Sequence, residues 1–417
     1  MGFVSNKNLI TEWHRLYRQK KMAWKFALFV AIVVIAVIVQ KVKIRIQTLT
    51  LPPGYSFNDE DCSLIGQSRG LIGSEDLALG RHSIIFVTSG DLFGIFENGV
   101  KSSRDGDIWM LDPRPGSDHE PVRVERLGFP EGKLFHPHGF DISNATDRMF
   151  AVNHHQTGSS IEVFRIIYNA ECAASIPWSC APARLEHEFS VTSEMFPYMG
   201  INDVVEVDSD HVYVTRWQVF SFPSGGKKHP SGVMEKLKLF AELPIMMLGL
   251  KFTYVYLCSI RDSVCTEASD VAFVGANGMT ISQDRSLLFV NDPLEKMITV
   301  FKVDKNNLKL TKESVIRLPV AADNIEYDDE SDQILIGTIP DITPMLQKTM
   351  RGEEIKVPGG LALADRDGQG SGWRVRDVLE HDGSKLSQIS AASRFGSTVF
   401  LGSPGAEGLL LCPGVHY

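Results

Sequence analysis

The chain has 417 residues, of which 43% are hydrophobic and 22% are charged, with 35 glycines and 20 prolines. This composition excludes a disordered, collagen-like or coiled-coil protein, and the length allows two domains or one large repetitive domain. The net charge of −9 argues against a nucleic-acid partner. The charge is also uneven, because residues 1–45 carry nine basic side chains and one acidic side chain.

The first element along the chain is an apolar run from Phe26 to Val39. Together with residues 22–24 it approaches the length that crosses about 30 Å of hydrocarbon, and Lys25 can extend its ammonium group toward the lipid headgroups. Six basic residues precede the run and three follow it, so the positive-inside rule predicts a cytosolic N-terminus. Because no small-residue cleavage site follows Val39, we favour an uncleaved signal-anchor over a cleaved signal peptide.

This interpretation sets the expected organisation of the whole chain. We expect a cytosolic tail at 1–21, a transmembrane segment at 22–40, a linker at 41–61 and a folded domain at 62–417. The protein would then be a type II single-pass membrane protein whose folded domain lies in the secretory lumen or outside the cell. Asn144 begins an Asn-Ala-Thr sequon, which such a domain could carry as a glycosylation site.

The cysteines agree with an oxidising compartment, because all six follow the anchor. They are Cys62, Cys172, Cys180, Cys258, Cys265 and Cys412. Six cysteines allow fifteen pairings. Two neighbouring pairs, 172 with 180 and 258 with 265, are each close enough to close a small loop, which leaves Cys62 to bridge to Cys412. Whether the two short-range pairs form disulfides stays open.

A pattern of about 62 residues recurs six times beyond the anchor. Each copy has a polar residue, a short alternating apolar stretch, a turn and a β-rich strand. The copies begin at Asp76, His138, Asn202, Asn277, Asn324 and, more weakly, Ser387. A unit of this size holds four short strands, which is one blade of a β-propeller. We therefore predict an all-β, six-bladed propeller; two separate β domains would leave the pairing of Cys62 with Cys412 unexplained.

Oxygen-bearing side chains recur at one phase of this repeat. They are Glu75, Asp76, Asn202, Asp203, Asn277, Asp323 and Asn324. Equivalent positions of a propeller lie on one ring about its axis, and hard oxygen ligands suit calcium rather than zinc. The register therefore predicts a central calcium site, although any one of these residues could instead only cap a turn.

Two histidines belong to the same region. If residues 144–147 form a turn, the flanking strands place His138 opposite Asn153 or His154. One histidine could take a proton from a water molecule while the other orients it, which is a general-base arrangement suited to neutral pH. A hydrogen-bonded histidine at a strand end with no catalytic role is the alternative. Farther on, the apolar residues 241–258 could form a core element, a lid over the channel or a surface against the bilayer.

From about residue 62 to residue 412 the sequence resembles the paraoxonase and arylesterase family. The segments that carry this resemblance are GSEDLAL at 73, HPHGFDIS at 136, VNH at 152, IND at 201, ANGMTIS at 276, DNI at 323 and LLLC at 409. The resemblance implies a six-bladed propeller with two calcium ions in its channel and a disulfide joining its ends. It also implies hydrolysis of lactones and aryl esters, with some members acting on organophosphates.

The resemblance assigns roles by position. It gives a catalytic calcium the ligands Glu75, Asn202, Asn277, Asp323 and Asn324. It gives a structural calcium the ligands Asp76, Asp203 and the backbone carbonyl of Phe140, and it makes His138 and His154 a catalytic dyad. The segment from Thr215 to Gln218 departs from the family, because an acidic residue and a histidine are expected near the entrance. Substrate preference therefore cannot be transferred from the family.

Three functions follow as hypotheses. The first is a calcium-dependent hydrolase of small-molecule esters or lactones, in which His138 activates water and Asp323 is an alternative base or nucleophile. The second is a non-catalytic, membrane-anchored propeller whose calcium only rigidifies the ring. The third is a condensing or synthase activity on a related propeller.

Overall fold

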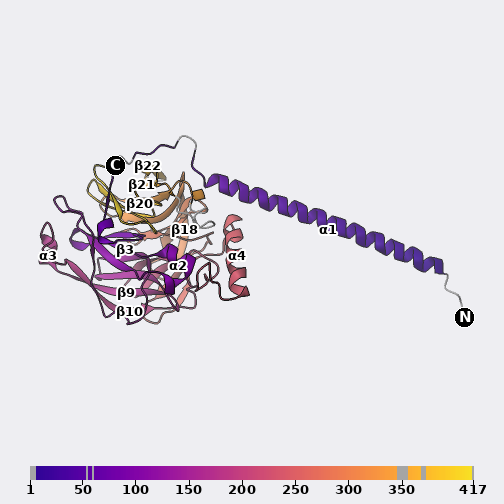
Figure 1. Cartoon of the computed structure of the whole chain (residues 1–417), viewed down its shortest axis with the longest axis horizontal. Coiled ribbons are helices and arrows are strands. Elements are labelled where there is room, and N and C mark those ends of the chain that lie inside the picture. The colour runs from indigo at the N-terminus through magenta and orange to yellow at the C-terminus, as the bar shows by residue number, and fades with distance from the viewer. Residues whose placement is uncertain (1–5, 53–54, 59–60, 345–355, 368–371, 416–417) are drawn as a thin grey trace. The chain divides into compact units, whose positions relative to one another are not determined.

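The computed structural model describes residues 6–52, 55–58, 61–344, 356–367 and 372–415 (Figure 1). The chain divides into two compact units, Met1–Thr48 and Leu49–Tyr417. We describe each unit by itself. The domain boundaries expected from the sequence stay predictions.

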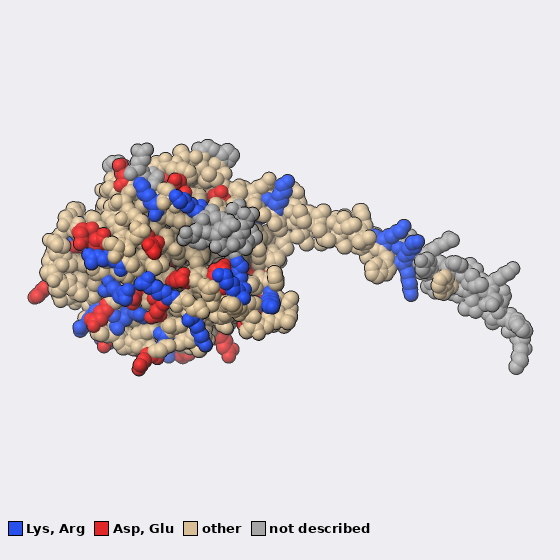
Figure 2. Space-filling model, viewed as in Figure 1, with Lys and Arg blue, Asp and Glu red and all other residues tan. Residues whose placement is uncertain are grey.

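Helix α1 (Asn6–Thr48) makes up the described part of the first unit. Its stretch Ala27–Thr48 is, among the described residues, the one helical segment long and apolar enough to cross a membrane. In Figure 2, two groups of basic side chains lie on α1 with an uncharged stretch between them. This pattern agrees with a signal-anchor, and the orientation in a membrane stays a prediction.

The second unit is a six-bladed β-propeller, as the repeat predicted. In the first five blades the strands follow one another along the chain. Blade 1 contains β2 (Leu77–Gly80), β3 (Ile84–Ser89), β4 (Asp107–Leu111) and β5 (Val122–Arg123), and blade 2 contains β7 (Pro137–Ser143), β8 (Arg148–His155), β9 (Gly158–Tyr168) and β10 (Ala183–Val191), with β6 (Arg126–Leu127) beside β10. Blade 3 contains β11 (Ile201–Asp208), β12 (His211–Arg216), β13 (Val255–Ser259) and β14 (Cys265–Glu267).

The remaining blades complete the ring. Blade 4 contains β15 (Met279–Ile281), β16 (Leu287–Asp292), β17 (Met297–Val303) and β18 (Leu310–Arg317), and blade 5 contains β19 (Ala321–Asp328), β20 (Gln333–Ile339), β21 (Gly359–Arg366) and β22 (Trp373–His381). Blade 6 contains β23 (Ala391–Phe395), β24 (Thr398–Gly402), β25 (Leu409–Cys412) and β1 (Ser63–Ile65). Each predicted repeat start lies within four residues of the first strand of its blade.

The ring is closed between the two ends of the propeller. Strand β1 pairs antiparallel with β25, so the outer strand of blade 6 comes from the beginning of the domain. Cys62 and Cys412, next to these strands, form a disulfide with Cα atoms 4.2 Å apart. The predicted long-range pairing is therefore confirmed, and it covalently fixes the closure that the strand pairing makes.

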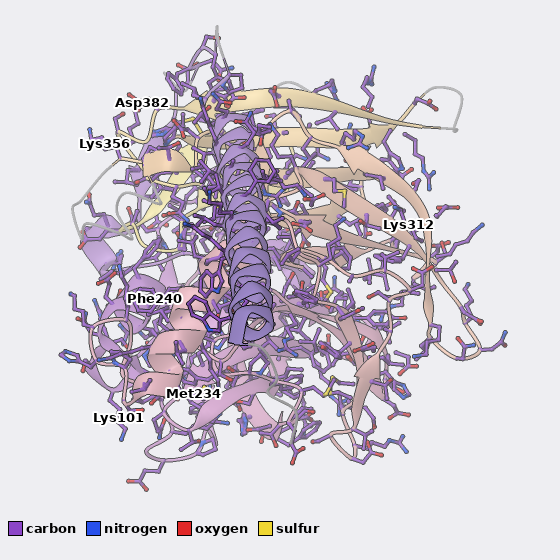
Figure 3. All side chains as sticks on the ribbon, turned by 90° about the vertical axis from the view of Figure 1, so that its right-hand side faces the viewer. Lys101, Met234, Phe240, Lys312, Lys356 and Asp382 are labelled. Atoms are coloured by element: carbon purple, nitrogen blue, oxygen red, sulfur yellow. A yellow bond between two sulfur atoms is a disulfide. The ribbon has the colours of Figure 1, made fainter. Side chains whose placement is uncertain are left out.

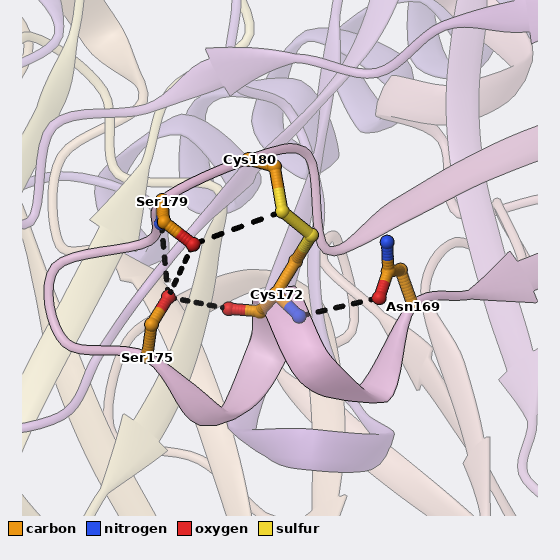
Figure 4. Close-up of a disulfide and its surroundings, with 5 residues drawn as sticks. All are labelled: Asn169, Cys172, Ser175, Ser179 and Cys180. Carbon is orange, nitrogen blue, oxygen red and sulfur yellow. Dashed lines mark hydrogen bonds between the residues drawn. A yellow bond between two sulfur atoms is a disulfide. The ribbon is translucent and has the colours of Figure 1, made fainter.

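Both short-range cysteine pairs are also disulfides. Cys258 and Cys265 face each other across β13 and β14. Cys172 lies in the short helix α3 (Ala170–Ala174) and is bonded to Cys180 in the loop that follows, and Figure 4 shows the side chain of Asn169 accepting a hydrogen bond from Cys172 N. The first bond links the two outer strands of blade 3, and the second constrains the connection between β9 and β10 of blade 2.

Apolar clusters fill the spaces between neighbouring blades. Phe86 of blade 1 and Phe164 of blade 2 belong to one cluster, and Tyr213 of blade 3 and Phe301 of blade 4 belong to another. All four side chains have no exposed surface. Inner strands such as β3 and β8 are accordingly buried at almost every position, because both of their faces pack against a neighbouring blade.

Helices join the propeller at the ends of its strands. They are α2 (Leu92–Asn98) and α4 (Val233–Met247), with short 3-10 helices at Gln67–Arg69, Arg81–Ser83 and Val100–Ser102. The apolar residues 241–258 divide between the second half of α4 and β13. In Figure 3, Met234 and Phe240 mark α4, and these side chains are 65% and 74% exposed. The lid and bilayer interpretations of this region stay predictions.

Candidate active site

The polar residues of the predicted ring lie on or next to the innermost strands. The pairing of β7, β11 and β19 with their neighbours shifts register around residues 138–139, 202–203 and 323–324. Such bulges interrupt the alternation by which consecutive side chains point to opposite faces of a strand. This explains how two consecutive polar residues in β11, and two in β19, can belong to one cluster.

Residues from four different blades meet in this cluster. Asn324 Nδ2 donates a hydrogen bond to Glu75 Oε1 over 2.8 Å. His138 Nε2 lies 3.6 Å from the same oxygen and 3.3 Å from Asn202 Nδ2. The register of the repeat therefore predicted a real convergence, since up to 249 residues separate these partners.

Two glycines allow the blades to come this close. A Cβ atom at Gly139 would lie 2.3 Å from Asp203 Oδ1, and one at Gly278 would lie 2.6 Å from the Cα of Asn324. Neither distance is compatible with a larger residue, because non-bonded heavy atoms pack at about 3.5–4.0 Å. The glycines in HGF and NGM are thus part of how the cluster is built.

Three buried oxygens of the cluster have no hydrogen-bond partner among the described residues. They are Glu75 Oε2, Asn202 Oδ1 and Asn324 Oδ1. Buried polar atoms are almost always satisfied, so three unsatisfied acceptors in one place indicate a missing positive or donating group. No group of three or more His, Cys, Asp and Glu side chains in the described part of the chain could hold a metal alone. A cation here would therefore need the amide oxygens as well, and such a mixed oxygen set suits calcium.

Burial and mutual repulsion disfavour the ionised form of the carboxylates in the cluster. Burial raises the pKa of Glu75 well above its usual range, and the charges of Asp76 and Asp323 raise it further. Burial also raises the pKa of Asp76 and of Asp323 to about 7, and it raises that of Asp203. A bound cation would reverse these shifts, because an opposite charge nearby favours the ionised form.

Asp76 and Asp203 are satisfied differently from Glu75. Asp76 accepts hydrogen bonds from Leu77 N and, across the blade boundary, from Phe140 N at 3.0 Å. Asp203 likewise accepts from Val204 N and from Met279 N of the next blade at 2.7 Å. Both side chains therefore already link neighbouring blades. The geometry supports the expected structural ion less directly than it supports the site around Glu75.

The two predicted histidines contact each other. His138 Nδ1 lies 3.0 Å from His154 Nε2, and both rings are buried. Because Asn202 Nδ2 can only donate, it assigns His138 Nε2 as an acceptor and His138 Nδ1 as the donor to His154. Burial lowers the pKa of His138 to about 3. The ring is therefore neutral at physiological pH, with a lone pair on Nε2.

A serine that the sequence did not single out completes this network. Ser159 Oγ lies 3.0 Å from His154 Nδ1 and accepts a hydrogen bond from Met199 N at 3.1 Å. It can donate to Pro197 O at 3.4 Å, which leaves it as an acceptor for His154 Nδ1–H. Burial, then the neighbouring His138 and His136, lowers the pKa of His154 well below its usual value. Ser159 therefore orients the second histidine.

A cavity of about 160 Å³ opens above the cluster. Its polar side is formed by Glu75, His138, Asn202, Asn277 and Asp323. Its other walls are mainly apolar, with side chains of α2, α4 and the segments after β12 and β20, among them Phe93, Phe96, Trp217, Met246 and Ile342. A polar floor under apolar walls is typical of a small-molecule site.

The remaining sequence-predicted residues are Asn144, which lies away from the cluster, and Asn277 and Asp323, which belong to it. Asn144 is exposed in the turn between β7 and β8, which is compatible with the predicted glycosylation. Asn277 and Asp323 are half-buried and contact each other by a side-chain hydrogen bond. Sequence reasoning missed Ser159, which does not occupy the common phase of the repeat, and it noted the segment with Trp217 only as a departure from the family near the entrance, not as a wall of the cavity.

Comparison with known proteins identifies relatives along nearly the whole propeller. The family model named Arylesterase matches residues 58–410. Serum paraoxonase/lactonase 3 of Homo sapiens is 26% identical over 347 residues, covering 82% of this chain and 86% of that protein. Serum paraoxonase/arylesterase 2 of Bos taurus is 26% identical over 339 residues, covering 79% of this chain and 83% of that protein.

Solved structures with a similar trace include a gluconolactonase of Xanthomonas campestris, with a TM-score of 0.41 and 13% identity over 87% of this chain and 98% of that chain. The allergen Mala s 1 of Malassezia sympodialis has a TM-score of 0.48 and 11% identity over 86% of this chain and 96% of that chain. The match of the family model over most of the folded unit decides the classification: the chain belongs to the arylesterase family, whose curated members include the serum paraoxonases.

Proposed function

We propose that this protein is a calcium-dependent hydrolase of carboxylic esters, acting on lactones and aryl esters. The observation that carries the proposal is the neutral His138, which lies beside unsatisfied buried oxygens at the floor of an apolar cavity. The named activities of the curated relatives, lactonase and arylesterase, support the same reaction class. Phosphotriesters are a further candidate substrate, because attack of water on phosphorus needs the same groups.

The residues that would hold the catalytic calcium are Glu75, Asn202, Asn277, Asp323 and Asn324. The unsatisfied oxygens of Glu75, Asn202 and Asn324 support this assignment. A calcium ion at this place would polarise the carbonyl of the substrate and stabilise negative charge on its oxygen. A second, structural calcium would use Asp76, Asp203 and the carbonyl oxygen of Phe140, close to the amides that these carboxylates already bind.

The chain's own groups would manage the proton. His138 would take a proton from the attacking water at Nε2, the nitrogen that Asn202 Nδ2 now approaches at 3.3 Å, and would return it to the alkoxide that leaves when the ester C–O bond breaks. His154 would accept the Nδ1–H of His138 and share the positive charge that develops, with Ser159 holding its ring. The apolar walls would exclude bulk water and position the organic part of the ester. Asp323 remains an alternative base, since it lines the same cavity.

The membrane arrangement is proposed from the sequence and the helix together. Residues 22–40 would span the bilayer, 1–21 would be cytosolic, and 41–61 would link the anchor to the propeller at 62–417. The three disulfides support a lumenal or extracellular location for the propeller. The partners are then the membrane and a small-molecule ester.

One experiment separates this proposal from a non-catalytic propeller and from a synthase. Turnover of phenyl acetate and of a γ-lactone is measured with the purified protein, with and without a calcium chelator, and for His138→Gln. His211→Gln, at the half-buried first residue of β12, is the matched control. We expect activity that needs calcium and His138 but not His211. Activity that resists both chelation and His138→Gln would disprove the mechanism, and no turnover of either ester would favour a binding module.

A further inference from the structure

The segment that departs from the family forms the cavity wall next to Asn202. Strand β12 ends at Arg216, and Trp217 N then donates a hydrogen bond to Gly200 O over 3.0 Å, two residues before Asn202. Trp217 and Asn202 both line the cavity. The indole is therefore a large apolar group in the cavity that also holds the proposed ion and base.

The indole is held in place at both its polar and its apolar side. Its Nε1 donates to Met199 O over 2.9 Å. Its ring contacts Phe96 of α2 edge to face, with centroids 5.9 Å apart, and Phe96 contacts Phe222 in the same way at 5.1 Å. Edge-to-face pairs of this kind fix ring orientation beyond simple packing. Trp217 is a preorganised surface rather than a mobile side chain.

Met199 connects this wall to the histidines. It has a left-handed backbone conformation with φ of 59°, which is uncommon for a residue with a side chain. Its N–H is bound by Ser159 Oγ and its carbonyl by the indole of Trp217. Met199 therefore binds both Trp217 and Ser159, and this fixes the distance between the cavity wall and the serine that orients His154.

The charged neighbours of Trp217 do not present their charge to the cavity. The guanidinium group of Arg216 donates to the carbonyl oxygens of Gln218 and Val219. The carboxylate of Glu242 on α4 accepts from Val219 N and Phe220 N, at 2.9 and 3.0 Å. Both charges hold the loop, so the indole offers the substrate an uncharged surface.

We propose that Trp217 is the specificity-determining residue of this cavity: its indole is the surface against which an uncharged alkyl or aryl substituent of the ester packs. This inference rests on the proposed hydrolase function and deepens it. Charged substituents are disfavoured there, because they would lose hydration without finding a partner. The unsubstituted ring of a lactone reaches the polar floor without needing the wall.

The test compares γ-butyrolactone with the same lactone carrying a γ-hexyl chain. We expect Trp217→Ala to lower kcat/KM for the hexyl lactone by at least about tenfold more than for the unsubstituted ring, mainly through KM, as loss of apolar contacts in a pocket does. Trp217→Phe should keep most of the preference for the hexyl lactone over the unsubstituted lactone. Trp373→Phe, a tryptophan on the outer strand β22 that packs on Phe289, is the matched control.

Binding of the corresponding unhydrolysable lactams, measured by calorimetry, gives a second readout. The hexyl lactam should lose affinity in Trp217→Ala by about the same factor, while the unsubstituted lactam should not. An equal loss for both rings, or an unchanged preference, would overturn the inference. Trp217→Leu replaces the alanine variant if that one is unfolded. If the wild type binds the hexyl lactam preferentially but hydrolyses neither lactone, the proposed function fails while the wall assignment stands.

Discussion

Two buried glutamates, Glu75 in the candidate site and Glu162 on β9 of blade 2, are surrounded in opposite ways. Glu75 is 2% exposed and Glu162 is fully buried. One oxygen of Glu75 has a single amide donor, and the other has no partner in the described part of the chain. Both oxygens of Glu162 are saturated. Its donors are Asn153 Nδ2, Ser160 Oγ, Lys133 Nζ, His187 Nε2 and Ser190 Oγ.

The difference appears directly in the pKa values. Burial raises the pKa of both carboxyls, but at Glu162 the hydrogen bond from His187 and the charge of Lys133 outweigh it and hold the pKa well below its usual range. At Glu75 the neighbouring carboxylates add to the effect of burial. Burial alone therefore does not identify a functional carboxylate. A functional carboxylate is instead identified by the lack of hydrogen-bond donors and cations around it, because the fold surrounds a structural carboxylate with such groups.

The largest effect on stability is expected from Glu162→Gln. This variant removes the anion from between Lys133 and His187, and it leaves the charge of Lys133 without its partner and the surrounding hydrogen-bond donors partly unpaired. Loss of one partner of a buried pair typically costs about 3–5 kcal/mol. Chemical denaturation should show this loss equally with and without chelator. A loss that appears only with calcium would mean that Glu162 also belongs to the ion site.

Glu75→Gln should give the contrasting result. We expect kcat/KM for esters to fall by about 10²–10³-fold, the range seen when one transition-state-stabilising group is removed. In chelator, however, the variant should be at least as stable as the wild type, because the amide removes a buried carboxyl that faces Asp76 and Asp323. Calorimetry with calcium should also show weaker binding. Destabilisation in chelator similar to that of Glu162→Gln would erase the distinction between the two glutamates.

The two regions should also respond to pH with opposite sign. In chelator, Asp76 and Asp323 have pKa values raised from 3.8 to about 7, so the folded state keeps protons that the unfolded state releases. Stability without calcium should therefore fall as pH rises from about 4 through 7. For Glu162, whose pKa is lowered from 4.5, the advantage of wild type over Glu162→Gln should shrink as pH falls below about 4.5.

Thermal melting from pH 8 down to about pH 2 checks both signs. Calcium should flatten the first trend, since a bound cation keeps the aspartates ionised in the folded state. A chelated protein that becomes more stable with rising pH would show that the cluster is compensated in some other way.

The smallest effect is expected at Ser159. Ser159→Ala removes the hydroxyl that holds His154 and Met199 N, and we expect kcat to fall about tenfold with little change in KM, equivalent to about 1.4 kcal/mol. Ser159→Thr keeps the hydroxyl and should restore most of the rate. An equal fall in kcat in both variants would indicate that Ser159 contributes packing and not a hydrogen bond to His154.

The sequence predicted the fold and the convergence well, for a physical reason. A repeated blade repeats its chemistry, so Glu75, His138, Asn202 and Asn324 stand at one phase of the pattern and meet on one axis. The pairing across the turn at 144–147 likewise brought His138 to His154. Regular spacing carries this information directly.

The other features of the site could not be predicted from the sequence, because they depend on irregular backbone geometry and on tertiary contacts. The bulges at 202–203 and 323–324 have no sequence signature beyond two consecutive polar residues. The left-handed backbone of Met199, which joins Ser159 to Trp217, is unmarked by glycine or asparagine. The Glu162 network joins segments from Lys133 to Ser190 with no common spacing. Such contacts are decided by tertiary packing alone.

The strand exchange in blade 6 has a consequence for biosynthesis. Because β1 pairs with β25, Ser63–Ile65 must wait for Leu409–Cys412 to be made before the sheet is complete. The Glu75 carbonyl is in turn bound by Ser390 Oγ, which directly precedes β23 of the same blade. The propeller of the growing chain therefore stays open until nearly the whole chain has been made. A product truncated before Leu409 would lack both the β1–β25 pairing and the Cys62–Cys412 disulfide.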